Sequence, residues 1–284
     1  MSPNDIRSSV AALAALPGVP ESIDKAREVC TQLRWHNALR RRIPEAAAES
    51  RVRGARASSE LDGARLSVEI VRDLMRGAVT WHDELDPVEQ VAKGAVAATA
   101  ETERLTPVVL SAPMQALARL HTAAAADLVP ADELGRPRRD GEDSREFVEL
   151  GDAPPAAEAR ERLRAVVDLL TATPSANLPV LVVAGLAHAE IVAARPFTRG
   201  NGVVARALER AVIAAGGLDP TGVAVPEVGH GTGGGPAYLG ALTAYTRGDA
   251  AGVGLWLTHC GDAVAAGAQE GERIADAVLA GRLT

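Results

Sequence analysis

Apolar residues at helical spacing run through most of this chain and constrain its fold more than any other feature. Between residues 20 and 49, Ile23, Ala26, Val29 and Leu33 recur every three or four positions, as on one face of an amphipathic helix. With 284 residues, of which 47% are apolar, the chain can bury a full core. We therefore predict an all-α fold. Further helices are expected over residues 64–76, 88–105, 157–171 and 178–194, and from 238 towards the C-terminus.

Two segments depart from this pattern. Residues 130–155 are polar and rich in proline and glycine, and within them residues 146–150 alternate apolar and polar side chains. That alternation predicts one arm of a small β-hairpin flap. Residues 229–235 are rich in glycine and predict a loop.

Charge and cysteine usage exclude several classes of function. A net charge of -7 argues against binding to nucleic acid, because phosphate backbones require a basic face. Cys30 and Cys260 lie far apart and offer neither a zinc motif nor a disulfide framework. No run reaches the roughly 18 apolar residues of a membrane span, so no membrane partner is expected. The cytoplasm is the predicted location.

A short glycine-rich turn is the strongest functional signal. Gly200, Asn201 and Gly202 directly precede a helical run of alanine, valine, leucine and arginine. Consecutive backbone N–H groups in such a turn can converge on an anion where the helix dipole is positive. The turn therefore predicts a phosphate-binding nest.

Around this turn the sequence resembles the Fic (Fido) family, whose motif is His-x-Phe-x-Asp/Glu-Gly-Asn-Gly/Lys-Arg-x-x-Arg. Most members transfer AMP from ATP to a protein hydroxyl. The resemblance implies an all-α, Fic-like domain of about eight helices with a nucleotide site, and a target protein at the flap, residues 136–152. The matching residues are Phe197, Gly200, Asn201, Gly202 and Arg206.

Three departures from the motif fall on its catalytic groups. Arg195 stands at the position of the general-base histidine, and arginine stays charged and cannot accept a proton. Arg199 stands at the metal-binding acid and would repel Mg²⁺, so no metal is expected. Val203 replaces the first phosphate-binding arginine. Arg195, Arg199 and Arg206 could still neutralise a phosphate without a metal.

A second match lies upstream. Ser58, Asp62 and Gly63 resemble the family's inhibitory helix motif, Ser/Thr-x-x-x-Glu-Gly/Asn, with Asp62 in place of the glutamate. In the family that glutamate pairs with the second motif arginine, so Asp62 is expected to face Arg206. The shorter aspartate predicts a looser pair than a bidentate one.

No other histidine is a convincing replacement for the missing base. His188 lies two helical turns before Arg195, about 10.5 Å away along the axis, and is interpreted as a core histidine. His121 is interpreted as structural. His230 lies in the glycine-rich loop, where it could fold over the site, and Glu190 is expected to accept an interhelical hydrogen bond.

The sequence thus predicts a degenerate Fido-domain protein that retains a nucleotide or phosphate site at Arg195, Phe197, Arg199, Gly200, Asn201, Gly202 and Arg206. Residues 1–105 would form a helical extension with the inhibitory motif, 106–260 the Fic-like core and 261–284 a C-terminal helix. Such a protein would be a pseudoenzyme or binding module for ATP or another nucleotide. Two alternatives stay open: a transferase of altered, metal-independent mechanism, and an interaction scaffold, including a homodimer, without nucleotide binding.

Overall fold

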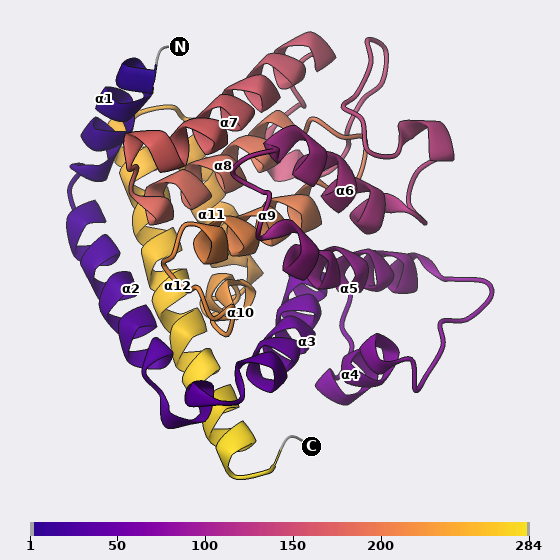
Figure 1. The fold of residues 1–284 in the computed structure, drawn as a ribbon. Helices are drawn as coiled ribbons and strands as arrows, with labels where there is room; N and C mark the ends of the chain where they lie inside the picture. The colour runs from indigo at the N-terminus through magenta and orange to yellow at the C-terminus, as the bar shows by residue number, and fades with distance from the viewer. Residues whose placement is uncertain (1–2, 283–284) are drawn as a thin grey trace.

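The computed structural model describes residues 3–282, and within that range the chain is entirely helical (Figure 1). Twelve α-helices and three short 3₁₀ helices are found there, and no strand. In chain order the elements are α1 (Pro3–Ala14), α2 (Val19–Arg34), η1 (Asn37–Arg40), α3 (Ile43–Leu61), α4 (Val68–Arg76), α5 (Pro87–Leu105), α6 (Pro113–Ala125), η2 (Ala131–Glu133), η3 (Val148–Leu150), α7 (Ala156–Ala176), α8 (Val180–Ala194), α9 (Asn201–Ala215), α10 (Pro226–His230), α11 (Gly235–Thr246) and α12 (Ala250–Leu279).

Helix α8 forms the centre of the core. It is apolar on all sides and almost entirely buried, as expected for a helix surrounded by others. Helices α7, α9, α11 and α12 pack around it. The long helix α12 runs beside α2 along one side of the molecule (Figure 1). Close approach of α10 to α12 depends on Gly229, because a Cβ there would lie 1.9 Å from the carbonyl oxygen of Ala263.

Local signals set the ends of several helices. At the start of α5, the Asp86 side chain accepts hydrogen bonds from the N–H groups of Val88 and Glu89, and Glu89 bonds back to the Asp86 N–H in a capping box. Gly77 ends α4 in the left-handed conformation, with φ of 69°. Gly200, with φ of 83°, precedes α9 in the same way. The motif turn is therefore a helix start, as the sequence indicated.

The all-α prediction is confirmed, but the β-hairpin flap is wrong. Residues 130–155 contain η2 and η3 with connecting turns, and no strand. Phe147 adopts a left-handed conformation, with φ of 52°, which interrupts any extended run. The carbonyls of residues 146, 147, 151 and 152 accept hydrogen bonds from Arg195 instead of from a neighbouring strand. Alternation over five residues was too short to distinguish a strand from such a loop.

A smaller difference concerns the glycine-rich segment. Gly229 and His230 belong to α10, so the loop is confined to residues 231–234. Ser58 lies in the last turn of α3, Asp62 is the C-cap of that helix, and Gly63 follows with φ of 87°.

None of the helices within residues 3–282 combines the length and the apolar character needed to cross a membrane.

Candidate functional site at the start of helix α9

The backbone turn before α9 already holds an oxyanion. The N–H groups of Gly200 and Asn201 donate to the Glu146 carboxylate at 2.7 Å and 2.9 Å. The Asn201 side chain donates a third bond to it at 2.8 Å. The Asn201 Oδ1 accepts from the Phe197 N–H at 3.0 Å, which keeps the turn in shape. These donors have the arrangement of an anion nest at a helix N-terminus.

A second carboxylate binds Arg206, one turn further along α9. The Arg206 Nη2 lies 2.7 Å from the Asp62 Oδ2, and the Arg206 Nε donates to the Ser58 hydroxyl at 2.9 Å. Burial lowers the pKa of Arg206, but the charge of Asp62 outweighs it and raises the pKa above its usual value. The Arg206 Nη1 is buried and has no hydrogen-bond partner. Asp62 thus contacts one guanidinium nitrogen closely, in keeping with the shorter side chain.

A cavity of about 590 Å³ opens beside these groups. Its wall combines apolar side chains with three carboxylates, Asp62, Glu146 and Glu149, and with Arg199. Gly202 also lines it, and a Cβ there would lie 3.0 Å from the Asp62 Oδ1 and 3.1 Å from the Arg206 Nη1. Gly200, Gly202 and Asp62 thus bring the cavity to the first turn of α9, whereas the fully buried Arg206 side chain does not line it. The apolar part of the wall comes from Leu61, Val91, Leu128, Val203 and Leu239.

Comparison with known proteins agrees with this geometry. Residues 111–212 match the model of the Fic/DOC family. This part of the chain is similar to a Fic domain. No curated protein matches the chain.

Solved structures of Fic proteins share the fold over most of the chain. A Fic family protein from Desulfovibrio desulfuricans G20 is 23% identical, with a TM-score of 0.65, and the match covers 87% of this chain and 73% of that one. Fic-1 (aa134–508) from C. elegans is 19% identical, with a TM-score of 0.67, covering 92% and 73%. A Fic domain containing signaling protein from Bacteroides thetaiotaomicron VPI-5482 is 14% identical, with a TM-score of 0.66, covering 90% and 98%.

Arg195, which the motif resemblance placed at the catalytic histidine, does not line the cavity. It ends α8 in a left-handed conformation, with φ of 43°, and is buried. Its guanidinium donates to the carbonyls of Gly151 and Asp152 at 2.8 Å each, and to those of Glu146 and Phe147. Burial lowers the pKa of Arg195. Arg195 therefore holds residues 146–152, called the 146–152 loop below, and makes no hydrogen bond to the nest.

Arg199 and Phe197 have different surroundings. The Arg199 side chain is 49% exposed, lines the cavity and places its Nε 3.7 Å from the Glu146 Oε1. Phe197 is buried and stacks on the His121 ring, with the centroids 4.0 Å apart. His121 contacts the Arg199 carbonyl oxygen and accepts from the Gly135 N–H. Burial lowers the pKa of His121 to about 4, so it is a neutral, structural residue.

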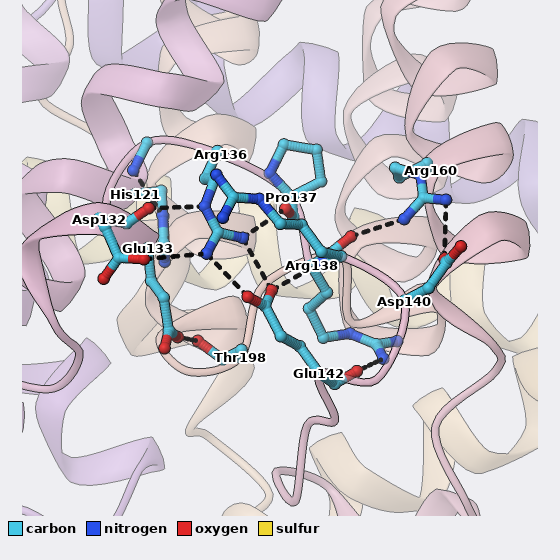
Figure 2. A network of polar contacts seen from close by, with 12 residues as sticks. His121, Asp132, Glu133, Arg136, Pro137, Arg138, Asp140, Glu142, Arg160 and Thr198 are labelled. Atoms are coloured by element: carbon cyan, nitrogen blue, oxygen red, sulfur yellow. Dashed lines mark hydrogen bonds and ion pairs between the residues drawn. The ribbon is translucent and has the colours of Figure 1, made fainter.

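A polar network fastens the segment before this loop to the Fic motif (Figure 2). Arg138 donates from Nε to the Arg195 carbonyl at 2.7 Å and from Nη1 to the Glu142 carbonyl at 3.0 Å. Arg136 makes two bonds to the Glu142 carboxylate, at 2.7 Å and 2.8 Å. On the other side, the Thr198 hydroxyl donates to Glu133 at 2.6 Å. The motif turn is therefore held from both sides.

A second polar cluster lies inside the protein, behind Arg206. The Glu209 Oε2 lies 2.6 Å from the His188 Nδ1 and 2.7 Å from the His230 Nε2. Burial acts to raise the pKa of Glu209, but the two imidazoles outweigh it and hold the pKa below the usual range. A carboxylate can only accept, so both imidazoles donate to it. The remaining imidazole nitrogens contact the Tyr238 hydroxyl at 2.7 Å and His259 at 3.1 Å.

This cluster accounts for the interior histidines. His188 is a core residue as interpreted, and burial lowers its pKa to about 4. His230 is buried in the cluster and does not fold over the site. The Trp256 indole stacks on the rings of His230 and His259 and donates to the Gly185 carbonyl at 2.7 Å. Three ligand-type atoms, from His188, Glu209 and His230, lie within 4.8 Å of one another, but their short contacts are those of hydrogen bonds.

Glu146 is the site residue that sequence reasoning missed. The sequence placed it in a hairpin arm, and nothing in the residues around it indicates a contact with Gly200, 54 positions away. By contrast, Glu190 accepts interhelical bonds from Arg162 and Tyr245, as its place in a buried helix suggested.

Proposed function

We propose that this Fic domain binds the phosphate groups of a nucleotide and does not transfer them efficiently. The observation that carries the proposal is the carboxylate held by Gly200, Asn201 and the Asn201 side chain. A carboxylate and a phosphate oxygen accept the same bonds, so a nest that holds one can hold the other. The cavity beside it has the size of a small-ligand site.

Arginines supply the positive charge for this anion. The buried Arg206 Nη1 has an unused donor next to Gly202, and the half-exposed Arg199 lines the same cavity. A cation at position 199 disfavours Mg²⁺ there, so we propose a site that does not need a metal. The nucleotide base would contact the apolar wall.

The absence of an activated base supports binding over catalysis. General-base catalysis needs an acceptor with a pKa near the working pH, within reach of the reacting hydroxyl. No histidine lines this cavity within residues 3–282, and His121 and His188 are buried and neutral. Loss of a general base costs on the order of 100-fold to 10,000-fold in rate.

Calorimetric titration of ATP and AMP, with Mg²⁺ and separately with EDTA, tests the proposal. Binding should persist in EDTA and disappear in Gly202→Glu, whose side chain would enter the space beside Asp62 and Arg206. Gly240→Glu is the matched control, because a Cβ at this exposed position of α11 meets nothing within 4 Å. Absence of binding under both conditions would exclude a nucleotide site and leave an interaction scaffold.

A further inference from the structure

The nest at α9 is filled by the protein's own side chain. Glu146 receives three charge-assisted hydrogen bonds there, from Gly200, Asn201 and the Asn201 amide, at 2.7 to 2.9 Å. Its carboxylate oxygens occupy the positions where the donors of the nest would place the oxygens of a bound phosphate. A phosphate ligand and Glu146 therefore cannot use these donors together.

The two arginines that depart from the Fic motif both hold Glu146 in this position. Arg195 bonds four carbonyls of the 146–152 loop, including that of Glu146 itself. Arg199 lies with its Nε 3.7 Å from the Glu146 carboxylate. Arg195 thus fixes the backbone of Glu146, and Arg199 attracts its carboxylate.

The environment of Glu146 allows exchange. Its side chain is 22% exposed and lines the cavity, so a ligand can reach the nest without unfolding the core. Burial raises the pKa of Glu146 and outweighs the hydrogen bonds from Asn201 and Gly200, which lower it. The ionised carboxylate therefore loses more solvation in the nest than these bonds restore. Neighbouring Phe147 lies over Gly202, 2.9 Å from where a Cβ would be. Because Phe147 adjoins Glu146 in the chain, release of Glu146 would also allow the Phe147 ring to move away from Gly202.

We infer that Glu146 is a built-in competitor for the phosphate site, held in the nest by Arg195 and Arg199. The inference rests on the proposed function, because it assigns a regulation to the same site. A phosphate group takes over the three donors, Glu146 turns out into the cavity, and Arg199 changes partner from carboxylate to phosphate. Occupancy of the site is thereby linked to the conformation of the 146–152 loop, which is exposed over much of its length.

This competitor is separate from the Asp62 contact. Asp62 comes from the end of α3 and binds a side chain, Arg206, whereas Glu146 comes from the 146–152 loop and binds the backbone of the turn. Each carboxylate reduces the fraction of molecules that can accept a ligand, and the apparent affinity falls by that fraction. Removing Glu146 should therefore tighten binding even with Asp62 in place.

ADP in EDTA is the probe for this inference, titrated into the full chain and into Glu146→Gln, Glu146→Ala and Glu161→Gln. Both Glu146 variants should bind ADP at least about tenfold more tightly than the parent protein, because the competitor's charge or the whole side chain is gone. Glu161→Gln removes an equal charge from the exposed face of α7, away from this loop, and should change affinity by less than about twofold. Circular dichroism would verify that the variants are folded.

Hydrogen exchange gives a second measurement on the parent protein. Saturating ADP should speed exchange in the 146–152 loop while it slows exchange at Gly202 and Val203. Equal ADP affinity in the parent protein and both Glu146 variants would overturn the competitor and leave nucleotide binding standing. No ADP binding to any of the four proteins would overturn the proposed function itself. A gain in affinity in Glu161→Gln as large as that in Glu146→Gln would overturn the competitor, because the effect would then be one of general charge.

Discussion

Two glutamates, Glu209 within helix α9 and Glu146 at its start, accept strong hydrogen bonds, but their surroundings make one permanent and the other exchangeable. Glu209 is 1% exposed and is held by two imidazoles that lower its pKa. Glu146 is 22% exposed, lines a cavity and has a raised pKa. The number of hydrogen bonds to a carboxylate therefore does not decide whether its role is structural. What decides is whether a competing ligand can reach the carboxylate.

The largest effect should come from removing the interior glutamate. Glu209→Ala leaves the N–H groups of His188 and His230 buried without an acceptor, and we expect the free energy of unfolding to fall by about 3–5 kcal/mol. Urea denaturation followed by circular dichroism measures it. Glu161→Ala, on the exposed face of α7, should stay within about 0.5 kcal/mol. A loss below about 1 kcal/mol in Glu209→Ala would remove the contrast between the two glutamates.

The second largest effect should be a fall in the free energy of unfolding at acid pH, caused by the interior histidines. Burial lowers the pKa of His188 to about 4 in the folded protein, against 6.5 when unfolded. Between these values the unfolded chain binds a proton that the folded chain does not, so stability falls as the pH falls from 6.5 to 4. His188 alone should contribute about 3 kcal/mol over that range.

Urea midpoints at pH 7, 6, 5 and 4 measure this effect. His82→Gln is the control, because that imidazole is 78% exposed and should leave the slope unchanged. A midpoint that is constant between pH 7 and pH 5 would show that the interior histidines are not held neutral.

Asp62 occupies an intermediate position in this comparison. It pairs with the fully buried Arg206 but is itself 23% exposed, so solvent screens part of the interaction. Asp62→Ala should lower the free energy of unfolding by about 1–2 kcal/mol. Thermal unfolding with and without ADP measures it, and ADP should restore stability more in this variant than in the exposed-loop control Asp83→Ala. Equal restoration in both would mean that Arg206 does not contact the ligand.

The smallest loss is expected at the exchangeable glutamate. In Glu146→Ala the donors of Gly200 and Asn201 face the cavity, where water can satisfy them, and we expect less than about 1 kcal/mol of destabilisation. The same urea titration as for Glu209→Ala measures it. A loss above about 3 kcal/mol would show that Glu146 is a structural cap, and the two glutamates would then be alike.

Contacts within one element were predictable from sequence, and contacts across the chain were predictable only through the family motif. Spacing of apolar residues predicts α5 and α8 closely, since a buried face repeats at the helical period. The Asp62–Arg206 contact joins residues far apart and was expected only from the resemblance to Fic proteins.

Glu146 escaped both kinds of reasoning. Its loop is shaped by Arg195, which follows two intervening helices, α7 and α8, and Phe147 takes a conformation that a residue of its type rarely adopts. Alternation of apolar and polar residues predicts a strand there. The pattern does not reveal that the Arg195 guanidinium donates to the carbonyls that a neighbouring strand would otherwise bond. The buried charge of Glu209 was hidden for a similar reason, since its two imidazole partners come from α8 and α10.

The ring stack at Trp256 gives the protein an optical reporter of its own interior. Of the three tryptophans in the chain, this one is fully buried, whereas Trp35 is 72% exposed. Indole emission is quenched by protonated imidazole at close range, and the His259 ring lies 5.5 Å from it. Acid that reaches the interior would dim a blue-shifted component while the red-shifted light of Trp35 persists. Unlabelled protein in a fluorimeter can thus reveal whether the interior takes up protons before or together with unfolding.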